Sequence, residues 1–134
     1  MLQSLLSIAS VAILLSACSV SNKTACVSKE RAWPLGSYLT RGIDPVQTNI
    51  LVTQDGLISF NKAIVSQADL KKYVQINESL IPAPPIILSH NPQAPCQPLE
   101  AVRRILDKTQ MCQEGRCGEQ RAWERIYGPL RSME

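Results

Sequence analysis

The sequence predicts a small α+β domain, in which a small mixed sheet with a β-hairpin has two helices packed on one face and is stapled by disulfides. Three observations lead to this fold class. Apolar and β-branched runs flank an Asp-Gly pair, two later segments carry apolar side chains at helical spacing, and the 134 residues include five cysteines. A chain of this length can form one small domain with a hydrophobic core.

A β-hairpin is the first regular element that the sequence predicts. Residues 48–53 and 57–61 form two runs rich in Ile, Leu and Val, and Asp55-Gly56 lies in the turn between them. Asp-Gly between such runs is a strong hairpin signal, because glycine readily adopts the positive φ that the turn requires. A second turn is expected at residues 61–63.

The next element is a helix that begins after Ser66 and ends near Asn77. Ser66 can cap the helix, and Asp69 stands three positions later, as in a capping box. The residues expected on its buried side are Leu70, Tyr73, Val74 and either Ile76 or Asn77, at helical spacing. A proline-rich break at residues 82–85 follows this helix.

The second half is expected to add a central strand and a second helix. Residues 86–90 form a short continuous apolar run, typical of a strand buried on both faces. Pro98 suits the first turn of a helix, which should end near Cys112. Its buried side is expected to hold Leu99, Val102, Ile105 and Leu106, and its outward side Arg103, Arg104 and Asp107. Residues 118–128 fit a helix and a strand equally well.

The N-terminus is typical of an exported protein. Residues 1–17 are apolar and uncharged and end in small residues before a cysteine, which predicts a signal peptide. The tetrad Leu15-Ser16-Ala17-Cys18 resembles the lipobox of bacterial lipoproteins, and this resemblance implies lipidation of Cys18, including palmitate. Residues 19–42 are polar with scattered apolar side chains, which predicts a tether and N-terminal segment over residues 18–42 that packs against the domain, residues 43–134. In enteric lipoproteins, an Asp directly after the acylated cysteine signals retention in the inner membrane. Ser19 stands at that position, so the resemblance implies the periplasmic face of the outer membrane, with the inner membrane as the alternative.

Four cysteines remain after Cys18, and an even number in an exported chain predicts disulfides. They are Cys26, Cys96, Cys112 and Cys117. Three pairings exist; Cys112 with Cys117 is the local choice, because the four residues between them can turn the chain back, and that leaves Cys26 for Cys96. No metal site and no cofactor are predicted, since zinc would need further ligands at short spacing.

The hairpin, helix, strand and helix resemble the periplasmic domain of the ExbD/TolR biopolymer-transport family. The resemblance rests on residues 49–65, NILVTQDGLISFNKAIV, followed by Asp69-Leu70, and extends through residues 86–88 and 99–102 to about Cys112. It implies a small module that dimerises or binds envelope partners, including peptidoglycan. Family members carry a membrane helix with an aspartate that serves the proton path, whereas residues 1–17 contain no acid. The proton-conducting role is therefore not carried over.

The sequence predicts no enzyme. His90 is the sole histidine, so a nucleophile would have only one candidate base, and Asp55, Asp69 and Glu100 are explained by the turn, the cap and the helix start. The net charge is only +3, and the basic residues are interspersed with acidic ones. This pattern excludes the continuous basic stripe of a nucleic-acid-binding protein. Outward basic side chains could contact an anionic polymer or form an ordinary solvated face; they are Lys71, Lys72, Arg103, Arg104 and Lys108.

Two functions follow as expectations. The first is a binding or scaffold module of the cell envelope, anchored in the membrane by lipid, with an envelope protein or peptidoglycan as its partner and a homodimer as one form. The second is a small disulfide-stapled inhibitor or exclusion lipoprotein that blocks an enzyme or a secretion channel, with residues 92–98 as its contact loop.

Overall fold

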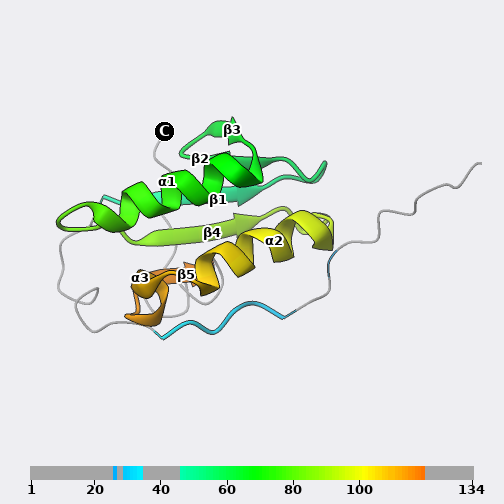
Figure 1. Ribbon diagram of the computed structural model, residues 1–134. Helices are drawn as coiled ribbons and strands as arrows, with labels where there is room; N and C mark the ends of the chain where they lie inside the picture. The colour runs from blue at the N-terminus through cyan, green and yellow to red at the C-terminus, as the bar shows by residue number, and fades with distance from the viewer. Residues whose placement is uncertain (1–25, 27–28, 35–45, 120–134) are drawn as a thin grey trace, which may run out of the picture.

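The computed structural model describes residues 26, 29–34 and 46–119, which form one layer of sheet and one layer of helices (Figure 1). The elements in chain order are β1 (Thr48–Val52), β2 (Ile58–Phe60), β3 (Ala63–Val65), α1 (Gln67–Ser79), β4 (Ile86–His90), α2 (Cys96–Asp107), α3 (Gln110–Gln113) and β5 (Cys117–Glu119). The α+β class is therefore confirmed. Within these residues, no helix is long and apolar enough to cross a membrane.

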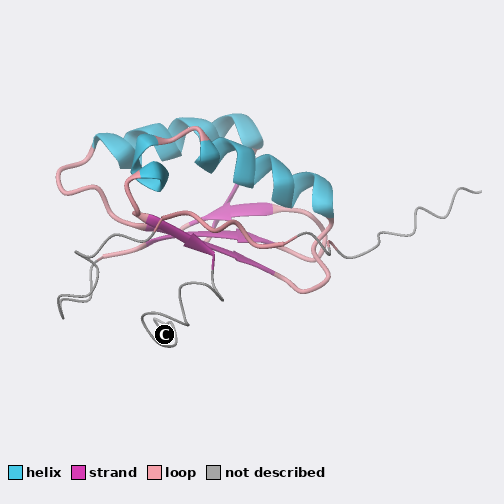
Figure 2. Cartoon of the chain, turned by 90° about the horizontal axis from the view of Figure 1, so that it is seen from below, coloured by secondary structure: helices cyan, strands magenta, loops and turns pink. Residues whose placement is uncertain are grey.

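The five strands form one mixed sheet in the order β3-β2-β1-β4-β5. β1 pairs antiparallel with β2, and β2 with β3, whereas β1 with β4 and β4 with β5 are parallel. Both parallel connections cross the sheet in the same direction, and such crossovers are right-handed, so α1 and α2 lie on the same face. Figure 2 shows this single-sided packing.

The predicted hairpin is confirmed as β1 and β2. Gly56 has a φ of 82° in the turn, as the Asp-Gly signal predicts. A Cβ at this glycine would lie 3.0 Å from a side-chain carbon of Pro95 and 3.2 Å from one of Pro98. The hairpin tip therefore packs closely against the start of α2. The next turn leads into β3, a third strand that the sequence did not predict as such.

The first predicted helix is confirmed as α1, capped by Ser66, whose hydroxyl accepts a hydrogen bond from the Asp69 amide. Its buried side is narrower than predicted. Asn77 is buried and Ile76 is half exposed, because the Thr48 hydroxyl donates to the Asn77 side chain, which in turn donates to the Pro84 carbonyl. Tyr73 remains 40% exposed and stacks on Phe60.

The second predicted helix is divided in two. α2 ends at Asp107 rather than near Cys112, and α3 starts after Thr109. The Thr109 hydroxyl ends one helix by donating to the Leu106 carbonyl and caps the next by accepting from the Cys112 amide. The chain then turns into β5, which overlaps the start of segment 118–128, for which the sequence left helix and strand open. Residues 120–128 of that segment lie outside the described residues.

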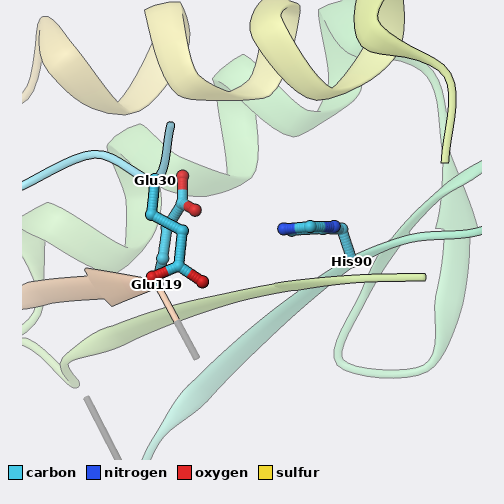
Figure 3. Close-up of side chains that lie close together, drawn as sticks. All are labelled: Glu30, His90 and Glu119. Carbon is cyan, nitrogen blue, oxygen red and sulfur yellow. The ribbon is translucent and has the colours of Figure 1, made fainter. Parts of the chain in front are cut away.

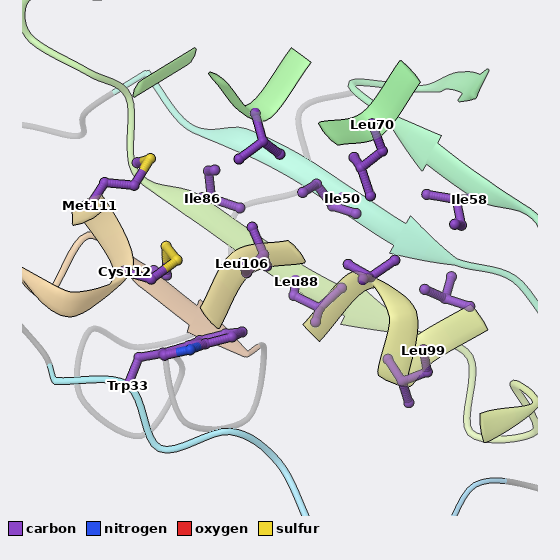
Figure 4. Close-up of a cluster of buried hydrophobic side chains, with 14 of the residues drawn as sticks. Trp33, Ile50, Ile58, Leu70, Ile86, Leu88, Leu99, Leu106, Met111 and Cys112 are labelled. Atoms are coloured by element: carbon purple, nitrogen blue, oxygen red, sulfur yellow. A yellow bond between two sulfur atoms is a disulfide. The ribbon is translucent and has the colours of Figure 1, made fainter. Parts of the chain in front are cut away.

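The hydrophobic core lies between the sheet and the helices (Figure 4). β4 is central, as predicted, and Ile86, Ile87 and Leu88 are fully buried. The buried set of α2 includes Leu99, Val102 and Leu106. Trp33, from the N-terminal segment, is buried against this core, so the described residues 29–34 pack on the domain.

Both predicted disulfides are present. Cys26 is bonded to Cys96 with a Cα–Cα distance of 4.5 Å, and Cys112 to Cys117 with 4.7 Å. The first bridge joins the N-terminal segment to the start of α2, and the Cys26 amide donates to the Ala94 carbonyl beside it. The second closes the turn between α3 and β5. Cys18 and residues 1–17 lie outside the described residues.

Candidate functional site

Four of the five basic side chains that were predicted to face outward are exposed, and one is buried. Lys71 and Lys72 on α1 and Arg104 and Lys108 at the end of α2 are exposed, as expected. Arg103 is fully buried, so its predicted outward position is wrong. It stands four residues after Leu99, on the side of α2 that faces the sheet. A second charged residue lies opposite it there.

That partner is Glu119, the last residue of β5, which is also fully buried. The Arg103 guanidinium donates to both carboxylate oxygens of Glu119, from Nε at 2.5 Å and from Nη2 at 2.9 Å. Its Nη1 donates to Glu100, one turn earlier on α2, at 2.6 Å. A planar guanidinium suits such two-point pairing with a carboxylate, which fixes both groups in orientation.

The electrostatics of this pair favour the charged guanidinium. Burial alone would lower the pKa of Arg103, but its hydrogen bonds to Glu119 and Glu100 and the charges of these carboxylates outweigh burial and raise it. A buried charge is tolerated only when it is paired and hydrogen-bonded in this way. α2 and β5 are therefore joined by a salt bridge within the core layer.

The N-terminal segment lies along this charged pair. Arg31 forms ion pairs with Glu100 and with Asp107, both at 3.3 Å. The indole nitrogen of Trp33 donates to Asp107 at 2.9 Å. With the Cys26–Cys96 bridge on the other side, these contacts hold the segment on both sides of Glu30.

Glu30, His90 and Glu119 come together from three distant parts of the sequence. One ligand atom from each lies within 4.8 Å of the others. Figure 3 shows the imidazole ring of His90 extending from the end of β4 toward the two carboxyl groups. Glu30 and His90 are half buried, whereas Glu119 is buried. Two carboxylates and an imidazole converge here, a set of groups that can bind a cation or share a proton.

His90, the sole histidine of the sequence, is the last residue of β4. Its Nδ1 lies 3.2 Å from the carbonyl oxygen of the next residue, Asn91. Its two neighbours could not be predicted from sequence, because Glu30 lies in the predicted tether and Glu119 in the segment that fits a helix and a strand equally well. A signal for Arg103 did exist: it falls inside the apolar stripe of α2, between Val102 and Leu106.

Cys26, Cys96, Cys112 and Cys117 are held in two disulfides. No family model matches the chain, and no curated protein matches it either. Fold and site therefore define a class by their own features: a one-sided α+β module, stapled by two disulfides, with a buried arginine–glutamate pair beneath a half-buried acid–histidine cluster.

Proposed function

We propose that this protein is a lipid-anchored binding or scaffold module of the cell envelope, held at the periplasmic face of the outer membrane. The described domain contains a hairpin, a helix, a strand and a helix in the order on which the resemblance to the ExbD/TolR periplasmic domain rests, and it adds β3, α3 and β5 to them. The observation that carries the proposal is an apolar strip along α1 and its C-terminal end, which is exposed in the described domain.

The strip consists of Tyr73, Ile76, Leu80 and Ile81, with exposed fractions of 40%, 51%, 49% and 98%. Tyr73, Ile76 and Leu80 are spaced by three and four residues, so they share one side of the helix and its end. Scattered apolar side chains are common on surfaces, but an aligned group favours a protein partner. An envelope protein therefore suits this strip better than a sugar polymer.

The sheet offers a second contact. Among the strands that the structure describes, β3 lies at one edge of the sheet, and Ile64 within it is 60% exposed. An edge strand presents unpaired backbone groups that can accept a strand from another chain. β3 and α1 are consecutive, so one partner, or a second copy of this chain, could contact both.

The Cys26–Cys96 bridge would hold the domain close to an anchor at Cys18. If Cys18 carries the lipid, eight peptide steps connect it to Cys26, and these span at most about 28 Å. Several acyl chains hold a protein at a bilayer far more firmly than one. The start of α2 would thus stay near the membrane surface.

The anchor is tested by the intact mass of the protein extracted from membranes. We expect a chain that starts at Cys18 and carries acyl groups, because the lipobox directs cleavage there. Reduction of two disulfides should add about four hydrogens to the mass. A chain that starts at Met1 without lipid would contradict the anchor and leave the membrane-spanning arrangement of the ExbD/TolR family as the alternative.

The partner is tested by photo-crosslinking in cells, with a crosslinking side chain at Ile76 or Ile81 of the full-length protein. We expect a defined adduct with an envelope protein or a second copy from these positions. The same crosslinking side chain in place of Arg104 or Lys108, two exposed residues at the end of α2, serves as the matched control and should give little crosslinked product. A monomeric protein without adducts from the strip, and without retention on peptidoglycan, would refute the proposal.

One observation favours the alternative, an inhibitor or exclusion lipoprotein. The loop before α2 is rigid, because Cys96 is bridged, Ala94 accepts from the Cys26 amide, and Gln54 donates to Gln93 at 2.8 Å. A preformed loop binds with less loss of conformational freedom. Loss of inhibition on replacing residues 92–95 would favour this alternative over the scaffold.

A further inference from the structure

We propose that Glu30, His90 and Glu119 form a binding site for a divalent transition-metal ion, with Zn²⁺ as the reference ion. The proposal is independent of the envelope partner. It starts from the convergence of three side chains, each of which can offer one ligand atom, within 4.8 Å of one another. One histidine nitrogen with two carboxylate oxygens is a donor set that zinc accepts in proteins.

The geometry requires only a small closure. Zinc binds nitrogen and carboxylate oxygen at about 2.0–2.2 Å, so tetrahedral ligand atoms lie about 3.4 Å apart. Glu119 is held by Arg103 and His90 by β4. Glu30 is half buried, and among the described residues its carboxylate makes no hydrogen bond or ion pair. Glu30 is therefore the ligand that can move inward.

Glu119 is oriented for binding, although it is already paired. An ionised carboxylate has about four lone-pair positions, and the two hydrogen bonds from Arg103 use two of them. Each oxygen thus keeps one position for an ion. Carboxylate ligands in metal sites are commonly fixed by such outer hydrogen bonds, which set their direction before the ion arrives. Arg103 is here a positioning residue.

The charges around the three ligand groups also favour the binding of a cation. Four carboxylates belong to the cluster and its surrounding ion pairs, from Glu30, Glu100, Asp107 and Glu119, against the two guanidinium groups of Arg31 and Arg103. Among the described residues, these groups sum to four negative and two positive charges, a balance that favours a cation over an anion as the ligand.

The segment that carries Glu30 is fixed in place on both sides. The Cys26–Cys96 bridge lies before it, and the ion pairs of Arg31 and the buried Trp33 lie after it. Ligands on a pinned segment bind with a smaller loss of conformational freedom. Zinc would in turn tie this segment to β4 and β5, which adds a structural link between distant parts of the chain.

The test is zinc titration of the full-length protein in detergent, after removal of metal with a chelator, followed by calorimetry. We expect one ion per chain and a rise in Tm on adding zinc, because an ion that binds only the folded state stabilises it. Glu30→Gln and His90→Ala should each weaken binding by about tenfold or more. Glu114→Gln, an exposed carboxylate on the C-cap of α3, is the matched control and should bind like the wild type.

Glu30→Gln keeps the test decisive even if His90→Ala unfolds, because the Glu30 side chain is half exposed and supports no described hydrogen bond. Substitution of cobalt for zinc adds an independent reading, since its visible spectrum should change in the Glu30 variant. An absence of saturable zinc binding would overturn the proposal. Binding that is unchanged in both variants, or a cluster that responds only to pH and not to zinc, would overturn it as well.

Discussion

Arg103→Met should lower the free energy of unfolding by about 3 to 5 kcal/mol, measured by denaturant titration. The substitution leaves the Glu119 carboxylate buried without the two hydrogen bonds that it now accepts from Arg103. Removal of one partner of a buried ion pair is costly, because the remaining group keeps its desolvation cost without compensation.

Two variants show whether this loss comes from the pair. Arg104→Met changes the neighbouring arginine, which is exposed, and should alter stability by no more than about 0.5 kcal/mol. Arg103→Met combined with Glu119→Leu removes both charges and should recover much of the loss, because an apolar pair in such a place is often neutral. A double variant no more stable than Arg103→Met alone would contradict this explanation.

The raised pKa of Arg103 sets the pH range of its contribution. A group whose pKa is higher in the folded state stabilises the fold at every pH below its unfolded value and loses that effect only as the pH rises through the folded value. Both values for an arginine lie in the strongly alkaline range. The guanidinium therefore stays charged at every pH at which the domain would be studied.

Loss of the Cys26–Cys96 bridge should lower the free energy of unfolding by about 4 kcal/mol in the variant Cys26→Ala with Cys96→Ala. The two cysteines are 70 residues apart, so the bridge restricts a long loop in the unfolded chain. The variant should also release the N-terminal segment and with it Glu30. We therefore expect weaker zinc binding together with the lower denaturation midpoint.

Mild reduction of the wild type provides a control without substitution. Cys96 is exposed, whereas Cys112 and Cys117 are fully buried, so a thiol should open the first bridge before the second. The partly reduced wild type should then match the stability of the variant. An alanine variant that unfolds at the same denaturant concentration as the wild type would show that the bridge contributes nothing.

Local sequence patterns were sufficient for the hairpin, the first helix and the central strand. Asp55-Gly56 predicts the turn because positive φ is a property of the glycine itself, and Ser66 predicts the start of α1 because its hydroxyl caps a backbone amide three residues away. These signals act over a few residues. β3 and β5, of three residues each, are too short to show a period.

The cysteine pairing could also be predicted from the sequence. The short spacing favours a bond between Cys112 and Cys117, which leaves Cys26 to pair with Cys96. The buried position of Arg103 was missed, although this residue falls within the apolar stripe of α2. Four residues after Leu99, a charged side chain on an amphipathic helix is usually placed toward water, since burial of a lone charge is unfavourable. Only the presence of Glu119 opposite makes burial acceptable.

Amino-acid order alone set the fold class, the turn, the first cap, the central strand and the two disulfides, because each depends on neighbouring residues or on simple counting. Tertiary structure alone decided the charged cluster. Glu30, His90 and Glu119 stand 60 and 29 positions apart in the chain, and no local pattern links them. They meet because β5 pairs with β4 and the bridge of Cys26 brings the N-terminal segment to α2.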